Sequence, residues 1–429
     1  MYKNAVLPAA AKSPRKTTVL QGKDWPQRLP HLASHWEHFT FLDSHSSTDK
    51  YSRYPWLCAF GRQPGKPLLT RLKQMEQWPG DWYFGHLNYN LKNEIENLHT
   101  QKPDEHTWPN LQFFCPHTII YAQSGKTVME SSYFSSQEEL EATLPKEHPF
   151  APLKTHLQPQ WNKAQYLAKI ARLKEHLQYG NIYEVNFCTE FTGREHIDPA
   201  ATFEHLNAQH KAPFSAFYRS GEDYLLCFSP ERYLQKANDK LYSQPIKGTA
   251  PRHSDPHKDE QARLHLRASE KEQAENVMIV DLVRNDLSKV AAPASVRVEE
   301  LFGIYTFPAV HQMVSTVSCT LKSHSSPADI IRATFPMGSM TGAPKVSALQ
   351  IIENEEALNR SLYSGSVGYF DPQGNFDFNV VIRSILYQAQ SQLLSLRVGS
   401  AITVHCQAEQ EYEECLLKAG KILKTLHGT

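Results

Sequence analysis

Apolar residues recur at helical spacing in the segment that follows Asn162. They lie three or four positions apart, at Leu167, Ile170, Leu173 and Leu177. This is the spacing of one face of an α-helix. Asn162 and Gln165 form a capping-box-like start, and Gly180 can end the segment. The pattern therefore predicts an amphipathic helix between Asn162 and Gly180.

Shorter apolar runs between turn residues predict β-strands. These runs cover residues 54–60, 111–121, 183–187, 224–228 and 380–386. Residues 270–290 have helical character again, and no repeat of 20 to 50 residues interrupts the mixture. The chain therefore predicts a mixed α and β fold.

A proline-rich segment separates the first third of the chain from the rest. Residues 143–159 contain four prolines, which remove helix hydrogen bonds and favour extended backbone. We therefore expect a boundary near residue 150, with one part at 1–150 and the other at 151–429.

Composition narrows the classes of function. The 429 residues include 45 Lys and Arg against 45 Asp and Glu, so no net charge draws the surface to nucleic acid or to an anionic membrane. No apolar run is long enough to span a membrane, and residues 1–11 lack an export signal. Seven scattered cysteines without CxxC spacing suit free thiols. These features predict a cytoplasmic protein that acts on a small molecule.

Two predicted helices carry paired glutamates. Glu272 and Glu275 lie three residues apart, and so do Glu411 and Glu414, with Lys418 one turn further on. Such spacing places each pair on one helix face. Two facing pairs would suit a hard cation such as Mg²⁺, whereas each pair alone is typical of a solvated surface. Spacing alone leaves both interpretations open.

Glycines flank two hydroxyl residues in the segment FPMGSMTGAPK, residues 335–345. Gly338 and Gly342 surround Ser339 and Thr341, so the backbone there can turn N–H groups toward an anion. An ordinary turn before a helix that begins near Pro344 explains the pattern equally well.

Glu231 and Lys247 are candidates for acid and nucleophilic chemistry. They lie in SPERYL and PIKGTAPR, 16 residues apart. A protonated glutamic acid can assist departure of a hydroxyl, and a lysine amine can attack carbon. As isolated residues they would more often form a surface ion pair.

Seven segments taken in order resemble one family. They are IYEVN, SPERYL, PIKGTAPR, AENVMIVDLVRNDLSKV, FPMGSMTGAPK, YSGSVGYF and VVIRS. Over residues 161–427 the chain resembles the chorismate-utilising enzymes, which include anthranilate, aminodeoxychorismate, isochorismate and salicylate synthases. The resemblance implies an α/β fold of two large, packed, antiparallel-rich sheets flanked by helices.

The same resemblance implies a magnesium site and a substrate site. Glu275 and Glu414 would bind Mg²⁺ directly, while Glu272 and Glu411 would act through water. The ion would hold the ring carboxylate of chorismate. The positions that match substrate-holding residues are Ser339, Thr341, Gly342, Tyr363, Arg383, Gly399 and Lys418.

Two positions favour the aminating branch of this family. Lys247 in PIKGT stands where anthranilate and isochorismate synthases usually have Ala, and Glu184 stands where isochorismate synthases usually have a water-activating Lys. In the aminating branch the lysine attacks C2 of chorismate while the acid, here Glu231, protonates the leaving C4 hydroxyl. Ammonia then enters at C4 and expels the lysine, giving 4-amino-4-deoxychorismate.

Three features qualify this reading. The family's active-site histidine is replaced by Gln312, with His311 beside it, and Ala401 stands where Gly is common. No cysteine lies in the glycine-flanked setting of a glutamine amidotransferase, so the resemblance implies a separate subunit that supplies ammonia. The alternative is anthranilate formation, which would also require elimination of pyruvate.

Overall fold

The computed structural model describes residues 14–47, 50–62, 68–100, 102–145, 149–308 and 310–428. The expectation that residues 1–11 carry no export signal lies outside this part of the chain. In the described ranges, no helix is both long enough and apolar enough to cross a membrane.

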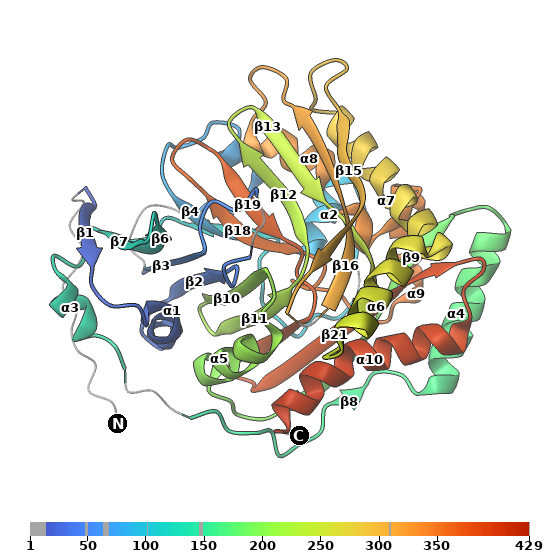
Figure 1. Ribbon diagram of the computed structural model, residues 1–429, viewed down its shortest axis with the longest axis horizontal. Coiled ribbons are helices and arrows are strands. Elements are labelled where there is room, and N and C mark those ends of the chain that lie inside the picture. The colour runs from blue at the N-terminus through green and yellow to red at the C-terminus, as the bar shows by residue number, and fades with distance from the viewer. Residues whose placement is uncertain are drawn as a thin grey trace.

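The larger of two β-sheets has twelve strands in the described residues and runs through most of the molecule (Figure 1). Its order is β1-β7-β6-β3-β2-β10-β11-β20-β21-β9-β17, and β8 also pairs with β9. The strands are β1 (Lys16–Leu20), β2 (His38–Asp43), β3 (Trp56–Gly61), β6 (Thr118–Gln123), β7 (Lys126–Ser131), β8 (Gln158–Pro159), β9 (Glu184–Arg194), β10 (Phe214–Ser220), β11 (Asp223–Ser229), β17 (Gly342–Ala343), β20 (Ser384–Gln388) and β21 (Leu393–Thr403).

The second sheet has nine strands in the described residues. Its order is β14-β16-β13-β12-β19-β18-β4-β5, and β15 also pairs with β16. The strands are β4 (Tyr83–Leu87), β5 (Leu111–Phe114), β12 (Arg232–Ala237), β13 (Lys240–Gln244), β14 (Ile246–Pro251), β15 (Arg297–Thr306), β16 (Val310–Thr320), β18 (Ser366–Phe370) and β19 (Phe376–Asn379). All pairings in both sheets are antiparallel, as the family resemblance implies.

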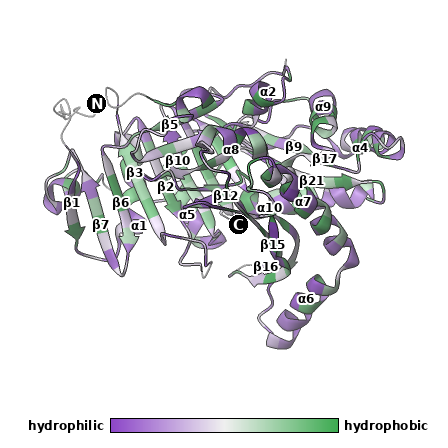
Figure 2. Cartoon of the chain, turned by 90° about the horizontal axis from the view of Figure 1, so that it is seen from above, coloured by the Kyte–Doolittle hydropathy of each residue, from purple (hydrophilic) through white to green (hydrophobic). Residues whose placement is uncertain are grey.

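Helices cover the outer faces of the sheets. They are α1 (Trp25–Arg28), α2 (Lys92–Ile95), α3 (Gln137–Glu141), α4 (Lys163–Gln178), α5 (Pro199–His210), α6 (Pro256–Ala268), α7 (Glu270–Ser288), α8 (Pro327–Thr334), α9 (Lys345–Glu355) and α10 (Ala408–Leu426). Short 3₁₀ turns occupy η1 (Leu29–His35), η2 (Leu72–Met75), η3 (Tyr89–Leu91) and η4 (Gly338–Met340). Figure 2 shows that α4 and α6 are largely hydrophilic, while long stretches of the strands are hydrophobic.

Apolar side chains join the layers. One core cluster packs α4, α5, α9 and α10 on the larger sheet, and a second packs α7 and α8 on the smaller one. A third lies between the sheets, where Phe84 and Tyr369 of one meet Ile119 and Leu225 of the other. The two packed sheets with helices outside confirm the predicted fold class.

The local predictions are largely confirmed. Helix α4 begins after Asn162, which forms a reciprocal capping box with Gln165, and Gly180 follows its end with φ +76°. The predicted strand run at 111–121 is two strands, β5 and β6.

Both sheets take strands from each side of residue 150, since β2 pairs with β10 and β4 pairs with β18. The proline-rich stretch connects α3 to β8, with residues 146–148 outside the described ranges. The division into 1–150 and 151–429 stays a prediction.

Candidate active site

A cavity of about 780 Å³ lies between the ends of the sheets and the helices α7 and α10. This volume is in the range typical of small-molecule sites. All the residues predicted for the site line this cavity except Thr341 and Gly342. The predicted residues that line the cavity are Glu231, Lys247, Glu272, Glu275, Ser339, Tyr363, Arg383, Gly399, Glu411, Glu414 and Lys418.

Lys247 is the centre of a buried charge cluster. It projects from β14, and its Nζ donates a hydrogen bond to Glu184 Oε1 at 2.6 Å and lies 3.9 Å from Glu275 Oε2. Glu184 begins β9 of the other sheet and is 1% exposed, and its second oxygen accepts no hydrogen bond from the residues that the structure describes. The lysine is therefore held between the sheets by a carboxylate that can accept its proton.

The electrostatics of the acid and the amine differ. Burial raises the pKa of Glu231 to about 7, although Ser339 and Lys247 oppose the rise. Burial alone would lower the pKa of Lys247, but the carboxylates of Glu184 and Glu275 raise it above its usual value. Glu231 is therefore poised to give up a proton near neutral pH, whereas Lys247 needs an acceptor before it can attack carbon.

The first glutamate pair comes from the beginning of α7. Ser269 caps this helix by accepting from the backbone N–H of Glu272, and the helix buries Asn276, Ile279 and Val283 at helical spacing. Glu272 and Glu275 lie one turn before Asn276 and Ile279 on the same helix face, and both line the cavity. Gly248, next to Lys247, has φ +82°, and a Cβ there would lie 2.9 Å from Glu272 Oε2. The glycine lets β14 approach the glutamate closely.

The second glutamate pair lies on α10. Its buried face includes Glu411, Cys415, Ala419 and Ile422, and Glu414 lines the cavity one turn along. Lys418 Nζ lies 2.6 Å from Glu414 Oε1. The predicted stripe of two carboxylates and one ammonium is thus present.

These carboxylates are crowded. Burial raises the pKa of Glu275 to about 7, with Glu184 and Glu272 adding to the rise. Burial and the neighbouring Glu414 also raise the pKa of Glu411. Closely spaced carboxylates with raised pKa values favour a bound cation, which would relieve their repulsion.

The donor set fits a hard cation that is shared with a ligand. In the described part of the chain, no three His, Cys, Asp or Glu side chains are grouped closely enough to hold a metal alone. Mg²⁺ commonly takes one or two protein carboxylates and fills its shell with water and substrate oxygens. The two glutamate pairs suit that arrangement, and their roles in metal binding stay predictions.

The remaining wall of the cavity is basic and polar. Arg383 has φ +52°, and its guanidinium donates no hydrogen bond to any other residue that the structure describes. Ser339 is buried beside Glu231, and Lys418 donates to the carbonyl of Gly399 at 2.8 Å. Free donors around a cavity are suited to binding the oxygens of a carboxylate.

Thr341 and Gly342 do not line the cavity. Thr341 Oγ1 turns back to the carbonyls of Met337 and Gly338. Gly342 has φ +155° and pairs with Val185, and a Cβ on it would lie 2.2 Å from the carbonyl of Glu184. These residues shape the loop that carries Ser339, and a substrate contact for them stays a prediction.

Gln312 rather than His311 reaches the cavity. Its Oε1 is buried and has no partner among the described residues. His311 points to the other side, where its nitrogens contact Thr306 Oγ1 at 3.0 Å and Asp259 Oδ1 at 3.1 Å. No histidine is among the described residues that line the cavity.

The structure adds residues to the site that the sequence did not single out. Asn186, Lys271 and Arg397 line the cavity, and Lys271 lies near all four glutamates of the two pairs. Asn186 is the last residue of the motif IYEVN, so the sequence offered a signal for it. Lys271 and Arg397 belong to none of the quoted motifs. Ala401 also lines the cavity.

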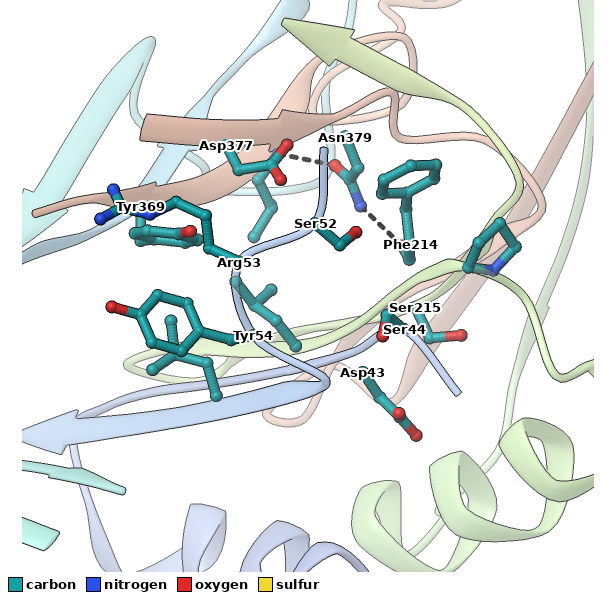
Figure 3. A pocket seen from close by; sticks show the side chains of 14 residues that line it. Asp43, Ser44, Ser52, Arg53, Tyr54, Phe214, Ser215, Tyr369, Asp377 and Asn379 are labelled. Carbon is teal, nitrogen blue, oxygen red and sulfur yellow. Dashed lines mark hydrogen bonds between the residues drawn. The ribbon is translucent and has the colours of Figure 1, made fainter. Parts of the chain in front are cut away.

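A second, smaller hollow of about 60 Å³ lies elsewhere between the sheets (Figure 3). Asp43 and Ser44 reach it from the end of β2, and Tyr369, Asp377 and Asn379 from β18 and β19. None of the predicted site residues lines it.

Solved structures share this fold. Anthranilate synthase component I from Streptococcus pneumoniae superposes with a TM-score of 0.71 at 20% identity, covering 99% of this chain and 95% of that one. The menaquinone-specific isochorismate synthase from Escherichia coli gives 0.77 at 17% identity and covers 97% of each chain.

Sequence relatives are more specific. The chain is 42% identical over 265 residues to aminodeoxychorismate synthase component 1 from Klebsiella aerogenes, covering 62% of this chain and 58% of the relative. It is 39% identical over 298 residues to the Escherichia coli protein of that name, covering 70% and 63%. The chloroplastic aminodeoxychorismate synthase of Arabidopsis thaliana is 34% identical, over 90% of this chain and 45% of that protein. The match spans less than two thirds of each relative.

The fold and the charged cavity define an α/β protein of two packed antiparallel sheets with a cavity lined by carboxylates and basic groups. The model of the chorismate binding enzyme family matches residues 17–424. The chain belongs to this family.

Proposed function

We propose that the protein replaces the C4 hydroxyl of chorismate with an amino group, giving 4-amino-4-deoxychorismate. The observation that carries the proposal is the placement of Lys247, hydrogen-bonded to Glu184, in one cavity with Glu231. The relatives named aminodeoxychorismate synthase support it. The activity is that of a transferase, and its product would pass to a separate lyase on the way to p-aminobenzoate and folate.

The first step forms a covalent bond to the enzyme. Glu184 takes a proton from Lys247, whose neutral nitrogen bonds to C2 of chorismate. The two ring double bonds shift toward C4, and the C4–O bond breaks. Glu231 protonates the leaving hydroxyl, which departs as water.

The second step reverses the shift with a new nucleophile. Ammonia bonds to C4, the double bonds move back, and the bond between C2 and the Lys247 nitrogen breaks. Glu231 recovers its proton from the new C4 ammonium, and Lys247 recovers its proton from Glu184. The sum is chorismate plus ammonia giving aminodeoxychorismate plus water, with the enolpyruvyl group intact.

We also propose Mg²⁺ as the cofactor. Glu275 and Glu414 would bind it directly and Glu272 and Glu411 through water, and the bound ion would supply a fixed positive charge for the ring carboxylate. Arg383, Ser339, Tyr363 and Lys418 would hold the second carboxylate of the substrate by hydrogen bonds and charge.

The source of ammonia is proposed to be a glutamine amidotransferase subunit. The relatives called component 1 support a partner component. All seven cysteines are free thiols and six are buried, which supports action in a reducing compartment, the cytoplasm.

Anthranilate formation is the second candidate, because an anthranilate synthase shares the fold. It needs a group that assists elimination of pyruvate. Gln312, which cannot act as an acid or base near neutral pH, occupies the wall where the family resemblance places a histidine. This favours amination without elimination.

The test is a product assay with chorismate, Mg²⁺, ammonium and added aminodeoxychorismate lyase, reading p-aminobenzoate and anthranilate together. We expect lyase-dependent p-aminobenzoate, reduced about 100-fold or more by Lys247→Ala because the nucleophile is gone. Lys240→Ala, an exposed lysine on β13, is the matched control and should behave as the wild type. Anthranilate as the sole product would assign the second function instead.

A further inference from the structure

Arg360 is a buried guanidinium behind the wall of the active-site cavity. The residue is 3% exposed, and it is not among those that line the cavity. It follows α9 in the segment LNRSLYSG, which includes Tyr363 and precedes β18. The face of Tyr89 lies 4.7 Å from its Cζ atom.

All five N–H donors of this guanidinium are used. Two go to the carboxylate of Glu356, from Nε at 2.9 Å and from Nη2 at 2.6 Å. The second hydrogen of Nη2 goes to the carbonyl of Asn186 at 2.7 Å. Nη1 donates to the carbonyl of Met340 at 2.6 Å and to Ser364 Oγ at 3.3 Å. Five is the full complement of an arginine side chain.

Three of these acceptors lie in or beside separate segments that line the cavity. Met340 directly follows Ser339, and both line the cavity. Asn186 lines it from β9, and Ser364 follows the cavity residue Tyr363.

The carboxylate of Glu356 makes a second connection to β9. Its Oε1 also accepts a hydrogen bond from the backbone N–H of Cys188 at 2.9 Å. Cys188 is paired on the sheet with Gly399 of β21, another cavity residue. The loop, β9 and the turn before β18 are therefore joined at one buried cation, and β21 adjoins them through its pairing with β9.

We infer that Arg360 is a positioning residue for substrate binding, which fixes the segments that carry Ser339, Asn186, Tyr363 and Gly399. The inference rests on the proposed function, in which these segments surround the carboxylates of chorismate. Lysine keeps the charge but has three donors on a flexible stem, so it cannot satisfy acceptors in this planar arrangement. A displacement of such walls by about 1 Å is enough to weaken a fitted site strongly.

Arg360→Lys is the decisive variant. We expect the Kd for chorismate, measured by calorimetry with Mg²⁺ and without ammonia, to rise about tenfold or more. KM should rise in parallel and by a larger factor than kcat falls, because Lys247 on β14 and Glu231 before β12 lie in segments that Arg360 does not contact. Of the reacting groups, only Glu184 lies on a strand that Arg360 contacts. An unchanged Kd in a folded Arg360→Lys would overturn the inference.

Lys92→Met is the matched control. Lys92 is 1% exposed and forms an ion pair with Glu353 at 3.1 Å, so it too is a buried cation bound to α9. Its loss should lower the melting temperature but leave the Kd for chorismate unchanged. An equal rise of Kd in this variant would reduce Arg360 to a general stabilising residue and also overturn the inference.

Glu356→Gln keeps the test decisive if Arg360→Lys does not fold. The amide preserves the shape and removes one charge-assisted acceptor, so a smaller rise of Kd in the same direction is expected. No rise in this variant counts against the inference. A wild-type protein that binds no chorismate would instead overturn the proposed function itself, which separates the two failures.

Discussion

At the scale of single residues, Glu231 links the geometry to the pH dependence of the reaction. Burial raises its pKa to about 7. Glu231 acts as an acid, so it must carry its proton when the reaction begins. Glu184 accepts the Lys247 proton inside the pocket, and saturating Mg²⁺ would keep Glu275, whose pKa is also raised to about 7, in its ionised form. Under these conditions Glu231 is the group whose protonation limits the rate near neutrality. We expect kcat/KM for chorismate to be level below pH 7 and to fall about tenfold for each pH unit above it.

The measurement is the ammonia-dependent rate between pH 6 and 9 at a constant concentration of free ammonia. Glu231→Gln should be slower by about 100-fold and should lose the break near pH 7, whereas Asp239→Asn, an exposed acid at the β12–β13 turn, should keep the wild-type profile. A wild-type rate that keeps rising through pH 9 would show that Lys247, whose pKa is raised above its usual value, loses its proton to solvent, and would contradict the role of Glu184.

The sequence predicts which residues belong to the site better than it predicts which of them contact one another. Lys247 and Glu231 could be singled out from their motifs, and both line the cavity. The hydrogen bond between Lys247 and Glu184 spans 63 positions and joins two different sheets, so no local pattern predicts it. Thr341 has the right chemistry for an anion contact, but its hydroxyl is used by carbonyls of its own loop.

At the scale of elements, α7 and α10 each bring one glutamate pair to the cavity, which makes cation binding a property of two helices. Removal of divalent cations with EDTA should abolish turnover, and added Mg²⁺ should restore it. Glu275→Gln should raise the Mg²⁺ concentration needed for half-maximal activity by about tenfold or more, because the variant loses a directly binding oxyanion.

Glu413→Gln is the matched control, because this exposed residue precedes Glu414 on the same helix and is not among those that line the cavity. Its Mg²⁺ requirement should equal that of the wild type. Full activity of the wild type in excess EDTA, or an equal shift in both variants, would remove the metal from the proposal.

The strands show where local pattern stops being informative. The apolar run at residues 380–386 predicts one strand, but β20 begins only at Ser384. The residues before it carry the chain from β19 of the smaller sheet to β20 of the larger one, and Arg383 has φ +52° at this crossing. A run of apolar residues shows only that the segment is buried. This segment stays buried while the chain passes from one sheet to the other, so the run does not show where the strand begins. The carboxylate pairs were predictable because i and i+3 on a helix need no knowledge of tertiary structure.

At the scale of the whole molecule, the two parts of the chain contribute adjoining blocks of strands to both sheets, and the blocks meet at β2–β10 and at β4–β18. The strand β2 pairs with β3 on one side and with β10 on the other, and β4 pairs with β18 and β5. The cation of Arg360 lies against Tyr89 of the first part. The composition of residues 143–159 favours a linker, yet composition cannot report which strands pair across it.

A fragment of residues 151–429 tests the predicted boundary. Removing residues 1–150 would take away the neighbours of β10 and β18 and expose unpaired backbone groups and apolar side chains in both sheets. We expect this fragment to show no cooperative thermal transition by circular dichroism, to bind a hydrophobic dye and to lack ammonia-dependent turnover. Co-expression with a fragment of residues 1–150 is the control, because strand pairing between the two pieces would restore a folded complex. A cooperative transition in 151–429 alone would instead establish the second part as an independent domain, because its strands would then be stable without their partners.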